Sequence, residues 1–156
     1  MKKASLLALV ALLALAALVA GCGGGDETTD SATVTLTKTE FIKQGDTICK
    51  EANEENETEA EEFAEENGFT LEKASKDELE EAVAEVLVPS LERQAEELDA
   101  LGAPEGDEEE VEAIVVALED ATAEIEDDPS LVFDEKTLEK PAQLSGEYGF
   151  KVCGQE

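Results

Sequence analysis

Apolar side chains recur at helical spacing through most of this chain, and this periodicity is the feature that most constrains its fold. Residues three and four apart lie on one face of a helix, so such a stripe marks the side that packs on a neighbour. In the first stretch the stripe includes Phe41, Ile48, Cys49 and Phe63. Alternation of apolar and polar residues, which is typical of a half-buried strand, extends over no useful length. The pattern predicts an all-α chain.

Capping residues and helix breakers divide the periodic region into four predicted helices. Thr37 with Glu40, and Ser75 with Glu78, have the capping-box pattern of a hydroxyl residue followed three positions later by glutamate. Asparagine, glycine and proline mark the turns between the helices. The predicted helices span residues 37–67, 75–102, 107–128 and about 134–148, with Gly149 as the last C-cap. Their short connections predict a small antiparallel bundle over residues 37–156.

Three positions interrupt the helical pattern. Pro89 lies inside the second predicted helix, where it is expected to kink the helix or break one hydrogen bond. Pro141 interrupts the fourth. Residues 53–59 of the first helix are polar, which indicates a segment that is exposed to solvent or frayed.

The composition is strongly acidic. Lys and Arg number 11 against 41 Asp and Glu, a formal net charge of −30. Binding to nucleic acid requires clustered basic side chains, so no nucleic-acid partner is expected. Acidic runs at residues 54–66 and 107–110 suggest either a weak cation-binding surface or a solvated face. The second interpretation is favoured, because acids occur on every predicted helix and no calcium-binding loop motif is present.

The chain contains no histidine. It therefore lacks the usual general base near neutral pH and the commonest metal ligand, which excludes Ser-His-Asp catalysis and His-bearing zinc sites. We expect no catalytic residues, no metal site and no cofactor. A hydrolase with paired carboxylates is the weakest of the alternatives.

The N-terminus has the three parts of a secretory signal peptide. Lys2 and Lys3 give a positive end, residues 6–20 form an apolar run, and small residues follow. As a helix this run would cover about 22 Å, short of the roughly 30 Å of a bilayer core, so an uncleaved membrane span is the less favoured alternative.

Val19-Ala20-Gly21-Cys22 resembles the lipobox of bacterial lipoproteins. The resemblance implies cleavage between Gly21 and Cys22, and acylation of Cys22 with diacylglyceryl and often a further fatty acid such as palmitate. Residues 1–21 would then be the signal peptide, residues 22–36 a lipidated N-terminus with a flexible tether, and residues 37–156 the helical domain. The wider layout, with Gly-Asp-x-Ile-Cys in the first helix and a final Tyr-Gly-x-x-x-Cys-Gly, resembles a group of small helical bacterial lipoproteins, and no activity is implied by it.

Assigning Cys22 to lipid leaves Cys49 and Cys153 as a pair. Export would place them in a compartment that permits disulfides, and a bond between them would close a loop of about 100 residues. Two buried free thiols are the alternative. Four aromatic residues are expected either to line a ligand pocket or, preferably, to pack around this disulfide: Phe41, Phe133, Tyr148 and Phe150.

These observations predict a location more firmly than an activity. We expect a lipoprotein held on the extracytoplasmic face of the cell membrane by the acyl chains on Cys22, with a non-enzymatic structural or protein-interaction role and an envelope protein as its partner. The alternative is a ligand- or cation-binding lipoprotein associated with a transporter. The sequence indicates no oligomeric state.

Overall fold

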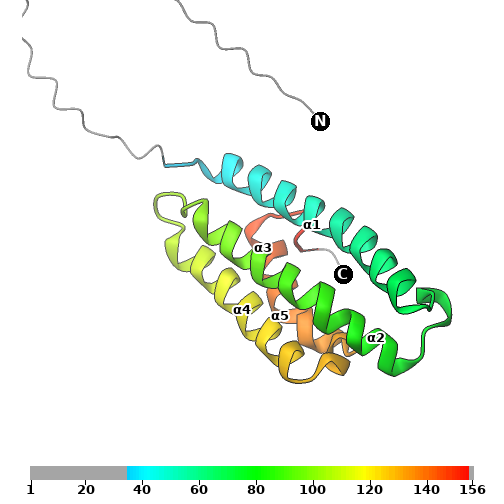
Figure 1. Ribbon diagram of the computed structural model, residues 1–156. Coiled ribbons are helices and arrows are strands. Elements are labelled where there is room, and N and C mark those ends of the chain that lie inside the picture. Colours follow the sequence, from blue (N-terminus) through cyan, green and yellow to red (C-terminus); the bar gives the residue numbers. More distant parts are fainter. Residues whose placement is uncertain (1–34, 155–156) are drawn as a thin grey trace, which may run out of the picture. The chain divides into compact units, whose positions relative to one another are not determined.

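The computed structural model describes residues 35–154, which are almost entirely helical and contain no strand (Figure 1). The long elements are α1 (Lys38–Asn67), α2 (Lys76–Ala82), α3 (Val88–Ala100), α4 (Glu108–Asp127) and α5 (Glu135–Tyr148). A π-helical segment, η2 (Val83–Leu87), joins α2 to α3, so these three form one continuous rod. Short 3-10 helices, η1 (Leu71–Lys73) and η3 (Pro129–Phe133), lie in the connections. The predicted all-α bundle of four helical rods is confirmed.

Both predicted capping boxes are present. The Thr37 hydroxyl accepts a hydrogen bond from the Glu40 backbone N–H, and the Glu40 carboxylate accepts from the Thr37 backbone N–H at 3.0 Å. Ser75 and Glu78 repeat the arrangement at the start of α2. These bonds satisfy orphan donors of the first turn and hold the pKa of each glutamate below its ordinary value.

Pro89 is accommodated by the π-helical segment that precedes it. Proline has no N–H, and its ring crowds the carbonyl four residues earlier. Here the Val88 N–H bonds to the Val83 carbonyl, five residues back, which widens the turn ahead of Pro89. The helix therefore continues through the proline at the cost of one regular α-helical turn.

Asp128 and Asp134 cap the starts of η3 and α5. Asp128 accepts hydrogen bonds from the backbone and hydroxyl of Ser130, which starts η3 and lowers the pKa of Asp128. Asp134 caps α5 by accepting from the Lys136 N–H at 3.1 Å. The predicted helix through Pro141 is confirmed, and Gly149 ends it with φ of 121°.

The four rods pack in sequence order, with α3 against α4 and α4 against α5, while α1 packs against α3 and η2. Among the described residues, the main hydrophobic cluster gathers at the end of the bundle where α1 begins and α5 ends. Three aromatic rings, Phe41, Tyr148 and Phe150, form its centre with centroid separations of 5.5–5.9 Å. A smaller cluster of Val88, Leu91 and Ile125 lies further along the bundle.

Two expectations about individual residues are wrong. Phe133 does not join the aromatic cluster; its side chain is 55% exposed at the end of η3. Leu36, which was assigned to the tether, is half-buried and packs against the main cluster, so the packed domain includes it. The predicted signal peptide, with Gly21 and Cys22, lies outside the described residues.

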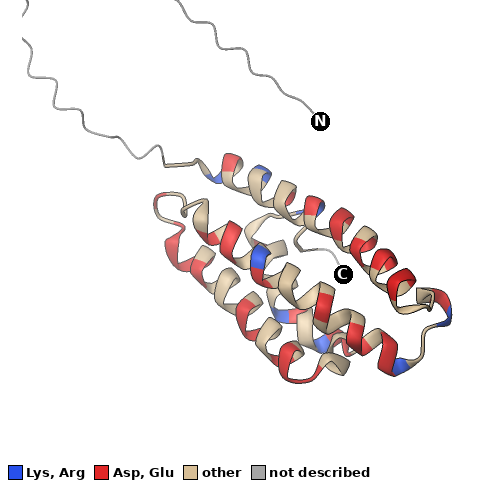
Figure 2. Cartoon of the chain, in the orientation of Figure 1, with Lys and Arg blue, Asp and Glu red and all other residues tan. Residues whose placement is uncertain are grey.

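Acidic residues are spread over all the α-helices rather than gathered at one place (Figure 2), and most of them are exposed. Some of the few basic side chains pair with them, as Lys50 does with Glu54 at 3.0 Å and Lys76 with Glu80 at 2.8 Å. Within residues 35–154, no helix is long and apolar enough to cross a membrane.

Gly45 provides a test of the packing on α1. A Cβ added there would collide with the Phe150 ring and lie 2.9 Å from Leu98 Cδ2. We expect Gly45→Ala to lower the free energy of unfolding by about 1–3 kcal/mol through overpacking. Gly146, in α5, has no atom within 4 Å of such a Cβ, so Gly146→Ala is the matched control and should stabilise by about 0.5–1 kcal/mol. Urea denaturation measures both, and equal effects would contradict this packing.

Candidate functional site

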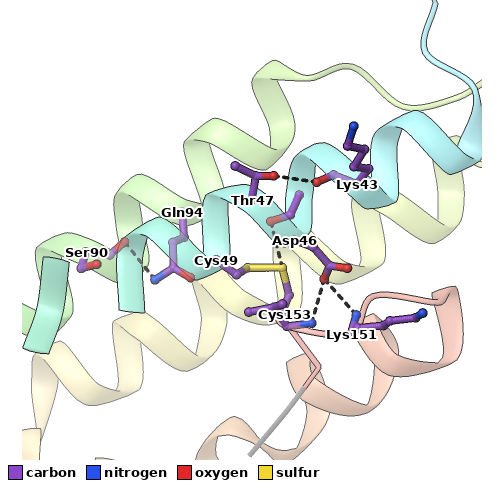
Figure 3. Close-up of a disulfide and its surroundings, with 10 residues drawn as sticks. Lys43, Asp46, Thr47, Cys49, Ser90, Gln94, Lys151 and Cys153 are labelled. Carbon is purple, nitrogen blue, oxygen red and sulfur yellow. Dashed lines mark hydrogen bonds between the residues drawn. A yellow bond between two sulfur atoms is a disulfide. The ribbon is translucent and has the colours of Figure 1, made fainter. Parts of the chain in front are cut away.

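The C-terminal segment is fastened to α1 at three neighbouring points, which we call the C-terminal clamp (Gly45, Asp46, Cys49 and residues 150–153). The Phe150 ring lies on Gly45, and one Asp46 oxygen accepts the backbone N–H groups of Lys151 and Val152 at 2.9 and 2.8 Å. Cys49 and Cys153 are joined by a disulfide, with their Cα atoms 5.3 Å apart. Figure 3 shows Asp46 and Cys49 on the same side of α1, facing the C-terminal segment. The predicted disulfide is confirmed.

Helical spacing explains why these groups act together. Gly45 and Cys49 are four residues apart and therefore share one face of α1, with Asp46 beside them. Asp46 makes two charge-assisted bonds to backbone N–H groups of the segment that follows α5. The clamp thus fixes the distance between α1 and the end of α5.

A cavity of about 500 Å³ lies beside the clamp, between α1, the α3 rod, α4 and α5. The clamp forms part of its wall, since both bonded cysteines and Val152 line it. Most of the remaining lining is apolar: Leu87, Leu91, Leu98, Ile114, Leu118 and Leu138. Its volume and composition are those of small-molecule sites in proteins.

The cavity runs along the bundle. α1 and α3 are antiparallel, because Gly45 lies against Leu98 while Glu55 pairs with Arg93 at 2.7 Å. Going away from the clamp, the lining therefore ascends α1 from residue 49 to 56 and descends α3 and the end of η2 from residue 98 to 87. On α5 it descends from Ser145 to Glu135, which is ten residues or about 15 Å.

Polar residues are distributed unevenly along the length of the cavity. The clamp end is lined by Cys49, Leu98, Ile114, Val152 and the small hydroxyl of Ser145. The far end holds Asn56, Asp134 and Glu135, while Asn53 and Gln94 lie between the two ends. A molecule in the cavity therefore meets an apolar floor at one end and oxygen-bearing side chains at the other.

Asn56 is the most informative polar residue of the lining. Its Oδ1 is buried and has no hydrogen-bond partner within the described structure. A buried acceptor without a partner costs about 1–3 kcal/mol, so such groups in folded proteins require an explanation. Gln94, also in the lining, uses its Nε2 in a long bond of 3.4 Å to the Ser90 carbonyl.

Sequence reasoning missed these amides because it interpreted residues 53–59 as an exposed or frayed segment. The exposure is confirmed for the other six residues of the segment, whereas α1 is not frayed there and Asn56 is half-buried. The positions of the two asparagines in the sequence indicate their side of the helix, because Asn53 and Asn56 lie four and seven residues after Cys49. Both therefore lie on the same side of α1 as Cys49, where Asn53 is exposed and Asn56 is half-buried.

The aromatic residues and acidic clusters take other roles. Phe41, Tyr148 and Phe150 pack in the core next to the disulfide and none of them lines the cavity. At the start of α4, Asp107 accepts the Tyr148 hydroxyl at 2.8 Å and pairs with Lys38 at 3.4 Å. Burial, with the hydrogen bond to Asp107 second, raises the pKa of Tyr148. In residues 35–154 no three acidic, cysteine or histidine side chains are arranged to hold a metal ion.

Comparison of the chain with protein-family models, with curated proteins and with solved structures gives no significant match.

Reduction of the disulfide in the clamp is expected to lower the stability of the domain strongly. Opening the Cys49–Cys153 bond frees a loop of 104 residues in sequence separation, and the loop-entropy model assigns such a bond about 3–5 kcal/mol. Urea denaturation with and without dithiothreitol should show this loss. The double variant Cys49→Ala/Cys153→Ala is the control, since its midpoint should not respond to the reductant. Identical midpoints of the native chain with and without reductant would contradict the prediction.

Proposed function

We propose that this chain is a membrane-anchored lipoprotein whose helical domain binds a small, largely apolar ligand on the extracytoplasmic face of the membrane. The observation that carries the binding function is the cavity beside the clamp, with its apolar floor and its unpartnered Asn56 oxygen. The anchor rests on the lipobox-like Val19-Ala20-Gly21-Cys22. Together they describe a domain that holds a molecule close to the lipid surface without transforming it.

Ligand binding replaces the structural or protein-interaction role as the favoured function for a geometric reason. A protein-docking face normally carries a contiguous exposed apolar patch. The exposed large apolar side chains of the described domain are Val116 on α4 and Phe133 on η3, which are single residues on different elements. The cavity is instead a concave site with convergent polar groups. Transfer of the ligand to a neighbouring transporter would be consistent with the anchored position.

Cation binding by the surface acids has less support. The acids in residues 51–66 of α1 are exposed, and Glu54 and Glu55 already pair with Lys50 and Arg93. Carboxylates along one helix do not surround an ion as a calcium loop does. The acidic surface therefore contributes a long-range field rather than a site.

The anchor is tested by Cys22→Ala. Without the cysteine there is no acceptor for the diacylglyceryl group, so we expect loss of incorporated radiolabelled palmitate and accumulation of an unprocessed or soluble form. Cell fractionation and labelling measure the two effects. Cys49→Ala is the control, because it removes a cysteine without removing the acceptor and should leave labelling intact. Normal processing, labelling and membrane retention of Cys22→Ala would overturn the anchor.

The cavity is tested with a neutral fluorescent probe, N-phenylnaphthylamine, in the Cys22→Ala background, which carries no acyl chain. We expect saturable binding that Ala142→Trp reduces at least about ten-fold, because residue 142 lines the cavity and an indole would occupy it. Ala123→Trp places the same side chain on the exposed face of α4 and should bind the probe normally. Equal binding by the two variants, or none by the parent chain, would overturn the ligand-binding function.

A further inference from the structure

We propose that the ligand is a single-chain amphiphile with a cationic amine head, which lies with its apolar body toward the clamp and its head between Asn56 and Glu135. This inference rests on the proposed ligand-binding function and names the chemistry of that ligand. It follows from the acceptors, the charges and the dimensions of the cavity.

The polar end of the cavity presents oxygen acceptors. The Asn56 Oδ1 is buried and unpartnered, and the acidic residue Glu135 is among those that line the same end. Asp134 also lies there, but one of its oxygens already accepts the Lys136 N–H as the cap of α5. A ligand that donates hydrogen bonds would satisfy Asn56, and a ligand that only accepts them would leave it unpaired.

Charge selects among the possible donors. No lysine or arginine is among the residues that line the cavity in the described structure. Lys136 and Lys140 follow Glu135 on α5, but both are exposed and neither contributes to the lining. A carboxylate or phosphate head at this end would therefore face the negative charges of Asp134 and Glu135 with no basic side chain in the lining to pair with it, which is unfavourable. The net charge of −30 adds a field that concentrates cations at the protein.

The dimensions favour a small amphiphile. The cavity is about 500 Å³ and extends about 15 Å along α5, from Ser145 to Glu135. One alkyl chain or fused ring system fits this space, whereas a membrane lipid with two acyl chains exceeds it. The apolar end, lined by Leu98, Ile114 and Val152, receives the body of the ligand. Glu135 is exposed, so the head reaches the solvent edge without losing all of its water.

The test compares decylamine, decanol and decanoate, which share one alkyl chain and differ in the head. The affinity of each compound is measured by displacement of the neutral probe from the Cys22→Ala chain. Each compound is used below its critical micelle concentration and at physiological ionic strength, which screens the surface charges. A charge-assisted hydrogen bond is worth about ten-fold or more in affinity, so we expect decylamine to bind about ten-fold more tightly than decanol. Decanoate should bind most weakly.

Matched variants separate the cavity from the acidic surface. Glu135→Gln and Glu139→Gln each remove one negative charge from α5, one turn apart, but only Glu135 lines the cavity. We expect Glu135→Gln to weaken the binding of decylamine about two- to five-fold, which is the range of an exposed ion pair. Glu139→Gln should leave the affinity for decylamine unchanged. Asn56→Leu replaces the amide by a side chain of similar size. It should weaken the binding of decylamine about ten-fold and have little effect on the binding of decanoate.

The outcomes distinguish the two proposals. Probe binding that Ala142→Trp abolishes, combined with decanoate binding as tightly as decylamine, would overturn the cationic head and leave the ligand-binding function standing. Equal losses for Glu135→Gln and Glu139→Gln would assign the amine preference to the surface and also overturn the inference. Absence of any saturable probe binding by the parent chain would overturn both.

Discussion

The attachment of the C-terminal segment to α1 is the interaction on which the rest of the domain depends. α3, α4 and α5 pack on one another in sequence order, but α1 contacts this layer mainly through α3 and η2. The disulfide and the two Asp46 hydrogen bonds hold the other side of α1 to the chain that leaves α5. Because the clamp lies at one end only, α1 and α5 are held together there, and the space beyond the clamp forms the cavity.

The negative charge of the chain opposes its folding, whereas some individual carboxylates stabilise the folded state. A net charge of −30 destabilises a compact state through self-repulsion. Some carboxylates are nevertheless stabilising, because the capping boxes hold the pKa of Glu40 and Glu78 below the unfolded values. A lowered folded pKa means stability that is present above the unfolded pKa and lost as the pH falls through the folded value. Acidification therefore relieves repulsion while it removes these caps, and the two effects oppose each other.

Local rules predicted most of the fold. The stripes and capping residues gave helix limits that agree with the structure near Thr37, Ser75, Asp134 and Gly149, because hydroxyl caps and glycine stops act within one turn. The pairing of Cys49 with Cys153 followed from assigning Cys22 to lipid. The π-helical turn before Pro89 was not predicted, since proline excludes a regular turn without specifying its replacement.

The cavity was the least predictable feature, because it depends on spacing between helices rather than on any one segment. Asn53 and Asn56 are as polar as the residues of a solvated face, and only their register with Cys49 indicates that they lie on the side of α1 that borders the cavity. Phe133 illustrates the opposite error, since an aromatic residue near a helix end was expected in the core and is exposed. Neither position can be assigned without knowing how α5 is held relative to α1.

The most direct test of this account measures binding of the neutral probe to the oxidised and the fully reduced protein, with far-UV circular dichroism recorded on the same samples. The clamp holds α1 beside α5, so reduction should weaken probe binding by at least about ten-fold under conditions where the helical signal is retained. Undiminished binding after complete reduction of the Cys49–Cys153 bond would contradict the claim that the clamp creates the site.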